Sequence, residues 1–541
     1  MFLPFAIRNP FRDRIWFRLC RVRRGYWRQV SKEKRMNSTH GILSVAALVV
    51  VIKLLAITSA YAAYSPPGFA LDMWFIKDKG VWHQFELNGP HPSDFDKPWP
   101  PLNQPGRPAL PWFEQGIFHS TSKDLVTWHD EGVAVTIGKP GEWDDGKIAS
   151  GNICKFGDTF YMFYPGIREH GKPGECATPI GLATSKDMIH WTKYSDRPIL
   201  VPDGKHYDPA GNWRDCSFLW DQKSKTWYTV ICATAAGEGP IENRACIALA
   251  KSADLIHWDF LPPLAVTDRY TLGLELPFLF KRGSKWYLGH SMYSSYYSKD
   301  WLARNPGARA LGGVHYLIGD SMFGPFTIPD DDCLGCQPDP PPYAVQLIDE
   351  GDEKLFMHWG PVRYATALPK RVEFLPDGRM RLGYWKGTEV ARKESLLGQE
   401  QLGFEIDAGG SVDVGKPVTD CFFEGTVSGG AVGFALGSAM LISADPISGV
   451  VQSLDPATRK PRDDRSGRTQ SAGPLRIKLV ADGSVVDVYA NDIWLFAEHN
   501  GQRQNPDQAR LLALAGKAKV EKIRLDRLVT GNKVHHYGFN Y

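Results

Sequence analysis

The sequence predicts an all-β protein with two main domains, and three observations lead to that prediction. The chain has 541 residues, which is too long for one ordinary domain. From about residue 63 to 385, short β-rich runs are broken by Gly, Pro, Asn and Asp, and no long stretch has a helical period. A second block of strand pattern then runs from residue 403 to the C-terminus.

The composition is that of a globular protein, with 43% hydrophobic and 23% charged residues. The formal net charge of +3 hides an asymmetry along the chain. Residues 1–62 hold 12 of the 63 basic and 2 of the 60 acidic side chains, so they carry +10 and the remainder −7. Because the body of the chain is mildly acidic, we expect no nucleic-acid partner.

Residues 1–62 read as a basic leader followed by a signal peptide. The apolar run 41–63 is interrupted by Lys53, and a charge near the centre of a bilayer is costly. Ala60-Tyr61-Ala62 fits the small-x-small pattern of a cleavage site. We therefore expect export, giving a secreted or periplasmic protein, with an uncleaved N-terminal anchor at residues 41–63 as the alternative. Met36 is a possible alternative start.

A motif of the form S-x-D-x-x-x-W recurs in the first β-rich block. It occurs at Ser122–Trp128, Ser185–Trp191 and Ser252–Trp258, each time after a strand of small or apolar residues. A recurring four-strand unit of this size is typical of a β-propeller blade. Residues 63–390 have room for five blades, the last two marked more weakly by Gly313–Phe326 and Lys354–Ala365.

The remainder of the chain is expected to form a C-terminal β-sandwich. Residues 391–402 are polar and lack a strand pattern, so they are predicted to be a linker. Within residues 403–541, Leu475–Val480 and Val485–Tyr489 alternate as half-buried antiparallel strands do. No cluster of His or carboxylate side chains is evident there, which favours a packing and stabilising role.

The cysteines give no sign of a metal site. Cys333 and Cys336 are spaced as C-x-x-C in an Asp/Pro-rich segment, but a zinc site would want a second ligand pair at similar spacing, and none is present. A disulfide or two free thiols is the preferred interpretation. Neither a P-loop nor a dinucleotide motif occurs, so no cofactor is expected.

Three acidic residues on different predicted blades could carry chemistry. They are Asp72, Asp215 and Glu275. Since the inner strands of a propeller converge on its central channel, these carboxylates can meet although they are far apart in sequence. Arg214 can pair with Asp215, while leucines beside Glu275 would disfavour its ionised form, as a general acid requires. Two carboxyl groups facing across a glycosidic bond make a glycosidase.

At these residues the chain resembles glycoside hydrolase family 32, the invertase and levanase group. The resemblance extends from about Leu71 to about Asp492 and implies a five-bladed propeller followed by a β-sandwich. Eight stretches carry it in the family's order: LDMWF, WHQF, HSTSKDLVTW, DGKIASGN, RDC, ELPFLF, LPKRVEFLPDGRM and ADGSVVDVY.

By that resemblance Asp72 would be the nucleophile and Glu275 the acid/base. Asp215 would stabilise the transition state, with Arg214 holding sugar hydroxyls. Trp74 could stack on a sugar or simply pack.

His83, His119 and Ser150 would be further pocket residues, with a structural role for either His as the alternative. The family's polar neighbours of the nucleophile are replaced here by Leu71, Met73-Trp74 and Leu87. A site without these hydrogen-bonding partners rejects a substrate that needs them.

The sequence thus predicts an exported glycosidase that hydrolyses O-glycosyl bonds of a carbohydrate, a furanoside of the fructoside type or another small-sugar glycoside. Three alternatives stay open. One is an inverting arabinosidase or xylosidase like those of glycoside hydrolase family 43, in which Asp72 would be a general base. The others are a glycosyl (fructosyl) transferase and a non-catalytic glycan-binding propeller.

Overall fold

The computed structural model describes residues 70–88, 116–168, 176–271, 273–338, 341–360, 365–398, 403–469, 472–482, 485–499 and 507–530. The expected leader or anchor, residues 1–62, lies outside these ranges, so export stays a prediction. None of the helices within them is long and apolar enough to cross a membrane.

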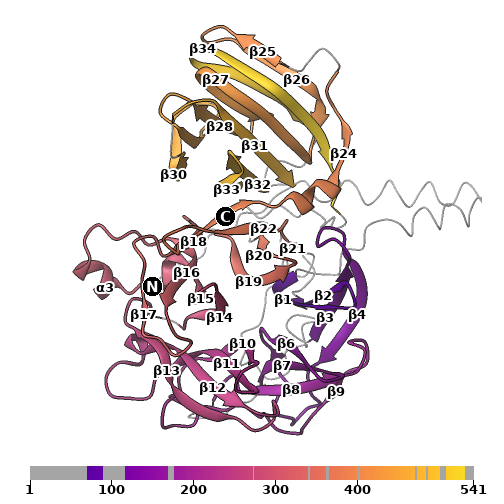
Figure 1. Ribbon diagram of the computed structural model, residues 1–541, viewed down its shortest axis with the longest axis vertical. Coiled ribbons are helices and arrows are strands. Elements are labelled where there is room, and N and C mark those ends of the chain that lie inside the picture. The colour runs from indigo at the N-terminus through magenta and orange to yellow at the C-terminus, as the bar shows by residue number, and fades with distance from the viewer. Residues whose placement is uncertain are drawn as a thin grey trace, which may run out of the picture. The chain divides into compact units, whose positions relative to one another are not determined.

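Five antiparallel sheets follow one another along the chain (Figure 1). The first sheet holds β1 (Ala70–Asp78), β2 (Val81–Asn88), β3 (Gly116–Ser122) and β4 (His129–Thr136). The second holds β5 (Lys147–Ile148), β6 (Asn152–Phe156), β7 (Thr159–Ile167), β8 (Ile180–Ser185) and β9 (Thr192–Lys193). The third holds β10 (Trp213–Asp221), β11 (Thr226–Thr234), β12 (Ala245–Ser252) and β13 (Asp259–Thr267).

The fourth holds β14 (Glu275–Arg282), β15 (Lys285–Met292), β16 (Gly312–Gly319), β17 (Phe326–Thr327) and β18 (Cys333–Gln337). The fifth holds β19 (Tyr343–Glu350), β20 (Glu353–Gly360), β21 (Ala365–Thr366), β22 (Lys370–Phe374) and β23 (Met380–Tyr384), and it continues into the C-terminal strands because Gly383 pairs with Ile493. The described helices are short: α3 (Lys299–Arg304) and the 3-10 turns η2 (Ile241–Asn243), η3 (Ser294–Tyr296) and η4 (Lys386–Ala391).

The five sheets are the blades of a propeller, as the sequence predicts. Their inner strands form a closed ring, in which β1 contacts β6, β6 contacts β10, β10 contacts β14, β14 contacts β19, and β19 returns to β1 (Figure 1). The strands of the two weakly marked blades are present as β16 and β20. The ring therefore brings the inner strands of distant chain segments side by side.

The repeated motif forms the same turn in three blades. In blade one the Ser122 hydroxyl accepts a hydrogen bond from the Leu125 backbone N–H at 2.8 Å. One oxygen of Asp124 accepts from the backbone N–H groups of Val126 (2.9 Å) and Thr127 (2.7 Å). Leu125 has a left-handed φ of 62°, and its side chain is buried. The equivalent turns are built from Ser185-Asp187-Met188 and Ser252-Asp254-Leu255.

Side chains close the ring between the last blade and the first. The Glu350 carboxylate accepts from Lys77 Nζ and from Trp82 Nε1, both at 2.7 Å. Further along the same interface, Thr366 donates to Gln84 at 2.7 Å. Since β1 and β19 belong to separate sheets, these polar contacts and the packing beside them replace a shared strand.

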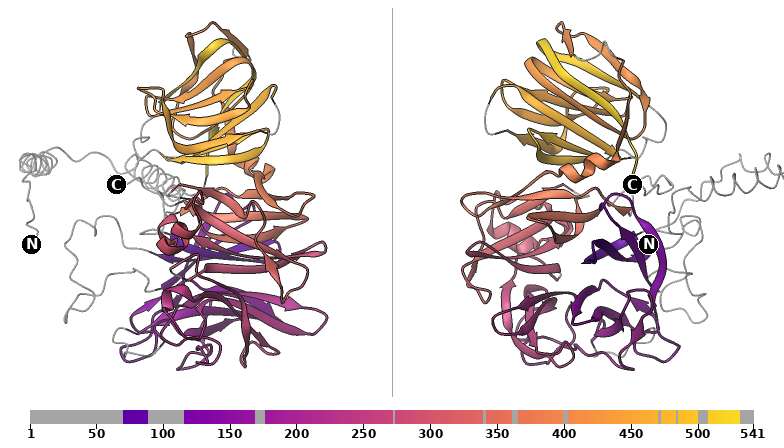
Figure 2. Two further views of the ribbon diagram at one scale, coloured as in Figure 1. Left: turned by 90° about the vertical axis from the view of Figure 1, so that its left-hand side faces the viewer. Right: turned by 45° about the vertical axis from the view of Figure 1, so that its right-hand side comes forward.

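The C-terminal part is a β-sandwich, as predicted (Figure 2). Its longest strands, β27 and β34, pair with each other, and β27 pairs on its other edge first with β31 and then with β28. The strands are β24 (Arg392–Ser395), β25 (Gly403–Ile406), β26 (Ser411–Val418), β27 (Cys421–Leu436), β28 (Met440–Asp445), β29 (Val450–Leu454), β30 (Pro461–Arg468), β31 (Leu475–Asp482), β32 (Val485–Ala490), β33 (Ile493–His499) and β34 (Asp507–Leu528).

One part of the expected linker is not a linker. Residues 392–395 form β24, which pairs with β34. The polar pattern arises because Arg392 is a buried cation whose guanidinium contacts Glu424 at 3.2 Å and Asp526 at 2.9 Å. A strand that buries a paired cation in place of apolar side chains lacks the alternation of apolar and polar residues by which a strand is recognised in the sequence.

We expect the Asp124→Ala variant to be less stable, because two backbone N–H groups of the blade-one turn lose their acceptor. The free energy of unfolding should fall by about 1 to 2 kcal/mol. Asp124→Asn keeps the accepting oxygen and should lose less than half of that. Denaturant unfolding of the three proteins side by side measures this, and equal losses in both variants would contradict the turn's role.

Candidate active site

The inner strands of four blades begin with the same irregularity. The pairing register shifts between Leu71 and Met73, between Arg214 and Cys216, between Glu275 and Phe278, and between Tyr343 and Gln346. At each bulge one residue that is not glycine has a left-handed φ: Asp72 (34°), Asp215 (55°), Leu276 (48°) and Ala344 (51°). Bulges re-aim side chains and are over-represented beside active sites. The carboxylates of interest all lie at these bulges.

Arg214 joins two of the carboxylates. Its Nη2 donates to Glu275 Oε1 at 2.7 Å, and its Nε lies 3.5 Å from Asp215 Oδ2. Its Nη1 donates to Asn212 Oδ1 at 2.6 Å, which fixes the plane of the guanidinium. Asp215 also accepts from the Leu276 backbone N–H at 3.3 Å, so blades three and four are linked directly at the site.

Asp72 is held from the second blade. The Ser150 hydroxyl, which precedes β6 and is buried, donates to Asp72 Oδ2. The structure therefore brings two of the predicted site residues, Asp72 and Ser150, into contact. Gly151 allows this approach, because a Cβ there would lie 2.4 Å from the Phe163 carbonyl oxygen.

Tyr343 is a site residue that sequence reasoning missed. It begins β19, and its hydroxyl donates to Glu275 Oε2. Its ring stacks on that of Tyr293, with centroids 3.7 Å apart and planes inclined by 19°. Its position is equivalent to that of Glu275 on β14, since each residue immediately precedes a left-handed one. The equivalent position at the start of an inner strand is the signal by which Tyr343 could have been predicted. With Tyr343, every blade contributes a residue to the site.

The three carboxylates act on one another electrostatically. Burial raises the pKa of Asp215 well above its ordinary value; the Arg214 guanidinium opposes the rise, whereas the charges of Glu275 and Asp72 add to it. Burial and the Glu275 charge also raise the pKa of Tyr296 to about 12. Tyr296 therefore stays protonated beside the carboxylates and remains a hydrogen-bond donor.

Trp74 and the two histidines do not lie with the carboxylates. Trp74 is fully buried in the core, so of the two predicted roles the structure shows packing, not stacking on a sugar. Trp74 follows the bulge by two residues. Because a shift of one residue in a strand exchanges its two faces, the bulge decides which of the following side chains face the core. His83 Nδ1 contacts His119 Nε2 at 2.9 Å, and His119 stacks on Phe85. Burial and the charge of His83 lower the pKa of His119 to about 3.

Glu275 is not enclosed by leucines as the sequence suggested. Leu276 and Phe278 turn away from it and line a cavity of about 370 Å³ on the inner strands. The carboxylate of Glu275 instead accepts from Arg214 and Tyr343, which lie on neighbouring blades. The same bulge that exposes Glu275 to the site turns the following residues towards the cavity.

A second buried carboxyl group lies beside the site on β2. Glu86 pairs across the strands with Met73, next to Asp72, and its side chain is buried. Gln84 Nε2 donates to it. Burial raises the pKa of Glu86 to about 7, against the lowering effect of the Gln84 hydrogen bond.

Fold and site together define a propeller–sandwich protein with a carboxylate centre on its inner strands. Residues 111–324 match the model of the N-terminal domain of the glycosyl hydrolases of family 32, so this part of the chain is similar to that family. A probable sucrose-6-phosphate hydrolase of Psychromonas ingrahamii is 41% identical over 87 residues, 16% of this chain and 15% of that protein. The levanase of Bacillus subtilis is 28% identical over 127 residues, 23% of this chain and 18% of that protein. The chain thus matches less than a fifth of the length of each.

Solved structures show the same fold. The Bombyx mori family 32 β-fructofuranosidase BmSUC1 superposes with a TM-score of 0.62 at 19% identity, over 86% of this chain and 93% of that one. Sucrose-6-phosphate hydrolase of Lactobacillus gasseri gives a TM-score of 0.60 at 16% identity, over 89% and 97%. These likenesses cover both the propeller and the sandwich.

The Glu86→Gln variant should lose a pH dependence of stability. A carboxyl group whose pKa is raised by folding stabilises the protein at low pH, and that stability is lost as pH rises from about 4.5 to about 7. From this group alone the wild type should lose about 3 kcal/mol over that range. Glutamine does not ionise, so the difference between variant and wild type should grow in favour of the variant over that range. A constant difference, measured by denaturant unfolding at several pH values, would contradict the burial of Glu86.

Proposed function

We propose that this protein is a glycoside hydrolase that cleaves a furanosidic bond, of the fructoside type or of another small sugar. The observation that supports this most is that Arg214 contacts both Asp215 and Glu275, while the charge of Asp72 acts on Asp215, at the bulges of three inner strands. Family 32 similarity at residues 111–324 supports the same reaction class. The carbohydrate would be the partner, and export through residues 1–62 belongs to this proposal.

In the proposed reaction Asp72 attacks the anomeric carbon while protonated Glu275 gives its proton to the leaving oxygen. The glycosidic bond breaks, and an ester forms between Asp72 and the sugar. Glu275, now ionised, takes a proton from water, which attacks the same carbon and releases Asp72. In the free site both oxygens of Glu275 accept hydrogen bonds, which suits this second, basic step.

Asp215 and Arg214 bind the sugar and take no part in the proton transfer by Glu275. Ser150 fixes the orientation of Asp72, so the nucleophile keeps one oxygen engaged and the other directed away from Ser150. Positioned carboxylates stabilise the positive charge that develops on the sugar ring in the transition state, and donors such as Arg214 hold the sugar hydroxyls. Tyr343 positions Glu275.

A second candidate is an inverting hydrolase of arabinosides or xylosides, in which Asp72 activates water. Met73 and Leu87 favour it, because the family's polar fructosyl contacts are replaced there by buried apolar side chains. NMR of the first-formed anomer on sucrose, sucrose 6-phosphate, levan, arabinofuranosides and xylosides distinguishes the two. Retention supports Asp72 as a nucleophile and inversion supports it as a base.

Glu275→Gln should lower kcat by about 10² to 10⁴-fold on whichever substrate is turned over, because general-acid catalysis is lost. Asp72→Asn should abolish turnover. Both variants should keep the circular dichroism and unfolding midpoint of the wild type within a few degrees. Near wild-type rates in both would show that these carboxylates do not carry the reaction.

Tyr343→Phe should keep its stacking on Tyr293 but lose the hydrogen bond to Glu275. A hydrogen bond to a charged group is worth enough to lower kcat by about tenfold to a hundredfold, with little change in KM. Tyr287→Phe is a matched control, since that hydroxyl donates to the Gly378 carbonyl at 2.8 Å, away from the site. Equal effects of the two substitutions would argue against a positioning role for Tyr343.

A further inference from the structure

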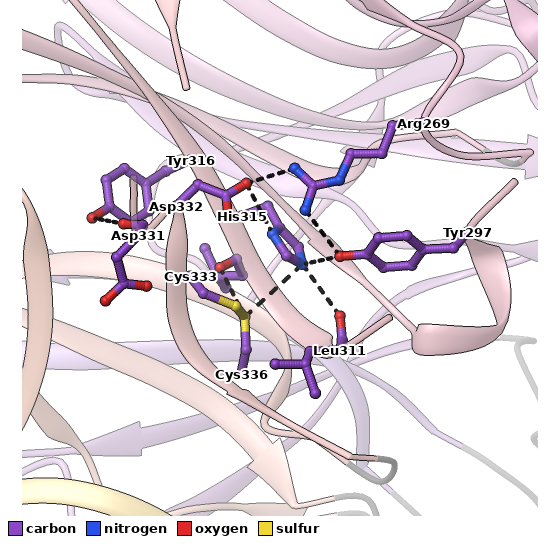
Figure 3. The surroundings of a disulfide bond; sticks show 10 residues. Arg269, Tyr297, Leu311, His315, Tyr316, Asp331, Asp332, Cys333 and Cys336 are labelled. Carbon is purple, nitrogen blue, oxygen red and sulfur yellow. Dashed lines mark hydrogen bonds and ion pairs between the residues drawn. A yellow bond between two sulfur atoms is a disulfide. The ribbon is translucent and has the colours of Figure 1, made fainter. Parts of the chain in front are cut away.

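Blade four contains a group of metal-ligand atoms in addition to the carboxylate site. His315 on β16 and the two cysteines of β18, Cys333 and Cys336, place one ring nitrogen and two sulfurs within 4.8 Å of one another (Figure 3). The sulfurs form a disulfide in this structure, so the disulfide alternative of the sequence analysis is the one present. No second ligand pair at C-x-x-C spacing occurs in the sequence, but the pairing of β16 with β18 supplies a ligand from another strand.

The histidine is oriented as a metal-binding histidine is. His315 Nδ1 lies 3.2 Å from Asp332 Oδ2, and Asp332 is held by Arg269 Nη1 at 2.7 Å. A carboxylate at the far nitrogen is the usual support of a ligating imidazole, because it fixes the ring and its tautomer. In the neutral tautomer that donates from Nδ1 to Asp332, Nε2 carries a lone pair on the side of Cys336 Sγ, 3.9 Å away (Figure 3).

Two other groups contact Nε2 in the disulfide form. The Tyr297 hydroxyl and the Leu311 carbonyl oxygen each lie 3.2 Å from it. The carbonyl oxygen can only accept, so its contact requires a proton on Nε2 and must give way when Nε2 binds an ion. The hydroxyl can rotate to donate elsewhere, and Arg269 Nη2 already contacts its oxygen at 3.1 Å. The imidazole is buried, whereas both cysteines are partly exposed. An ion can therefore arrive from the solvent side, where the sulfurs are.

We propose that His315, Cys333 and Cys336 bind a thiophilic divalent cation of the zinc type when the disulfide is reduced. Two equivalents of a thiol reductant convert the disulfide to two thiols and are themselves joined as a disulfide. The cation then displaces one proton from each thiol and takes Nε2 of neutral His315, so that three protein ligands leave a fourth position for water. Two thiolates and Asp332 balance the charges of the cation and Arg269.

The disulfide and the bound cation would link different parts of the blade. The disulfide joins residues three apart in one strand, and so short a loop constrains the unfolded chain little. The cation would join β18 to β16 across the sheet. Because a ligand that binds only the folded state stabilises it, the reduced protein should gain thermal stability with added zinc, and the oxidised protein should not.

The test uses the full chain, reduced with a phosphine and freed of reductant without air, and titrated with Co²⁺ and then Zn²⁺. We expect one equivalent of Co²⁺ to give a thiolate-to-cobalt absorption band that Zn²⁺ abolishes, and the oxidised protein to give none. His315→Ala should weaken binding by at least about tenfold, and Asp332→Asn by about tenfold to a hundredfold. Cys176→Ser, which removes a free and partly exposed thiol elsewhere, should bind as the wild type does.

A reduced wild type without stoichiometric binding would overturn the proposal. So would affinity unchanged by both His315→Ala and Asp332→Asn, because binding would then involve other thiols. If His315→Ala does not fold, Asp332→Asn and the comparison of reduced with oxidised wild type decide the outcome, since both proteins retain all three ligands. Neither result depends on glycosidase activity, so this proposal and the proposed function fail separately.

Discussion

The site depends on a backbone constraint: a left-handed residue at the start of the inner strands. Asp72, Asp215, Leu276 and Ala344 adopt φ values that side chains other than glycine avoid, at a cost of about 1 to 3 kcal/mol each. Only a structure that fixes these strands from several sides maintains them. The ring of inner strands does so, because each is paired with the next strand of its own blade and packed against the inner strands of two neighbours. The propeller is thus the means by which four bulges are held at one place, and the bulges direct the functional side chains.

Charge imposes a second cost on the same residues. Asp215 is buried, and its ionised form is opposed by desolvation and by two other carboxylates. Arg214 offsets part of this by contacting both Asp215 and Glu275. Removing one charged side chain of such a buried set leaves the charges of the others unpaired, which is destabilising. Because Arg214 and Asp215 are neighbours on one bulge, the cation is held beside the buried carboxylate. The apolar cores of the blades and of the sandwich offset the free-energy cost of burying these charges.

The sequence was informative where the signal is local. The Ser-x-Asp turns are each specified within seven residues, so the repeat predicted the blades, and the order of short motifs predicted the propeller followed by a sandwich. Asp72, Arg214-Asp215 and Glu275 were predicted as site residues for the same reason. Tyr343, Glu86 and the approach of His315 to Cys336 were missed because they depend on cross-strand register, which a single sequence does not display. Trp74 shows the converse: an aromatic residue two positions from a catalytic candidate lies in the core, because the bulge fixes which side chains face the axis. Residues 392–395 lack a strand pattern because Lys393, Glu394 and Ser395 are exposed, while the charge of Arg392 is balanced by carboxylates that are distant in sequence.

The departures from the family 32 pattern can be understood through burial. Met73, Trp74 and Leu87 replace polar residues around the nucleophile, and all three are buried in this protein. Met73 packs in one apolar core cluster, and Trp74 and Leu87 pack in another. The positions that are polar in the family are therefore part of the packing in this protein. Glu275, Arg214 and Asn212 retain polar contacts with one another, and Tyr343 and Tyr296 add donors from blades four and five. Under the proposed function, recognition of the sugar would then shift from blade one towards blades three to five, while the proposed catalytic carboxylates stay in place. Such a shift changes which hydroxyl groups of a sugar are matched by donors, and leaves the reaction at its anomeric carbon unchanged.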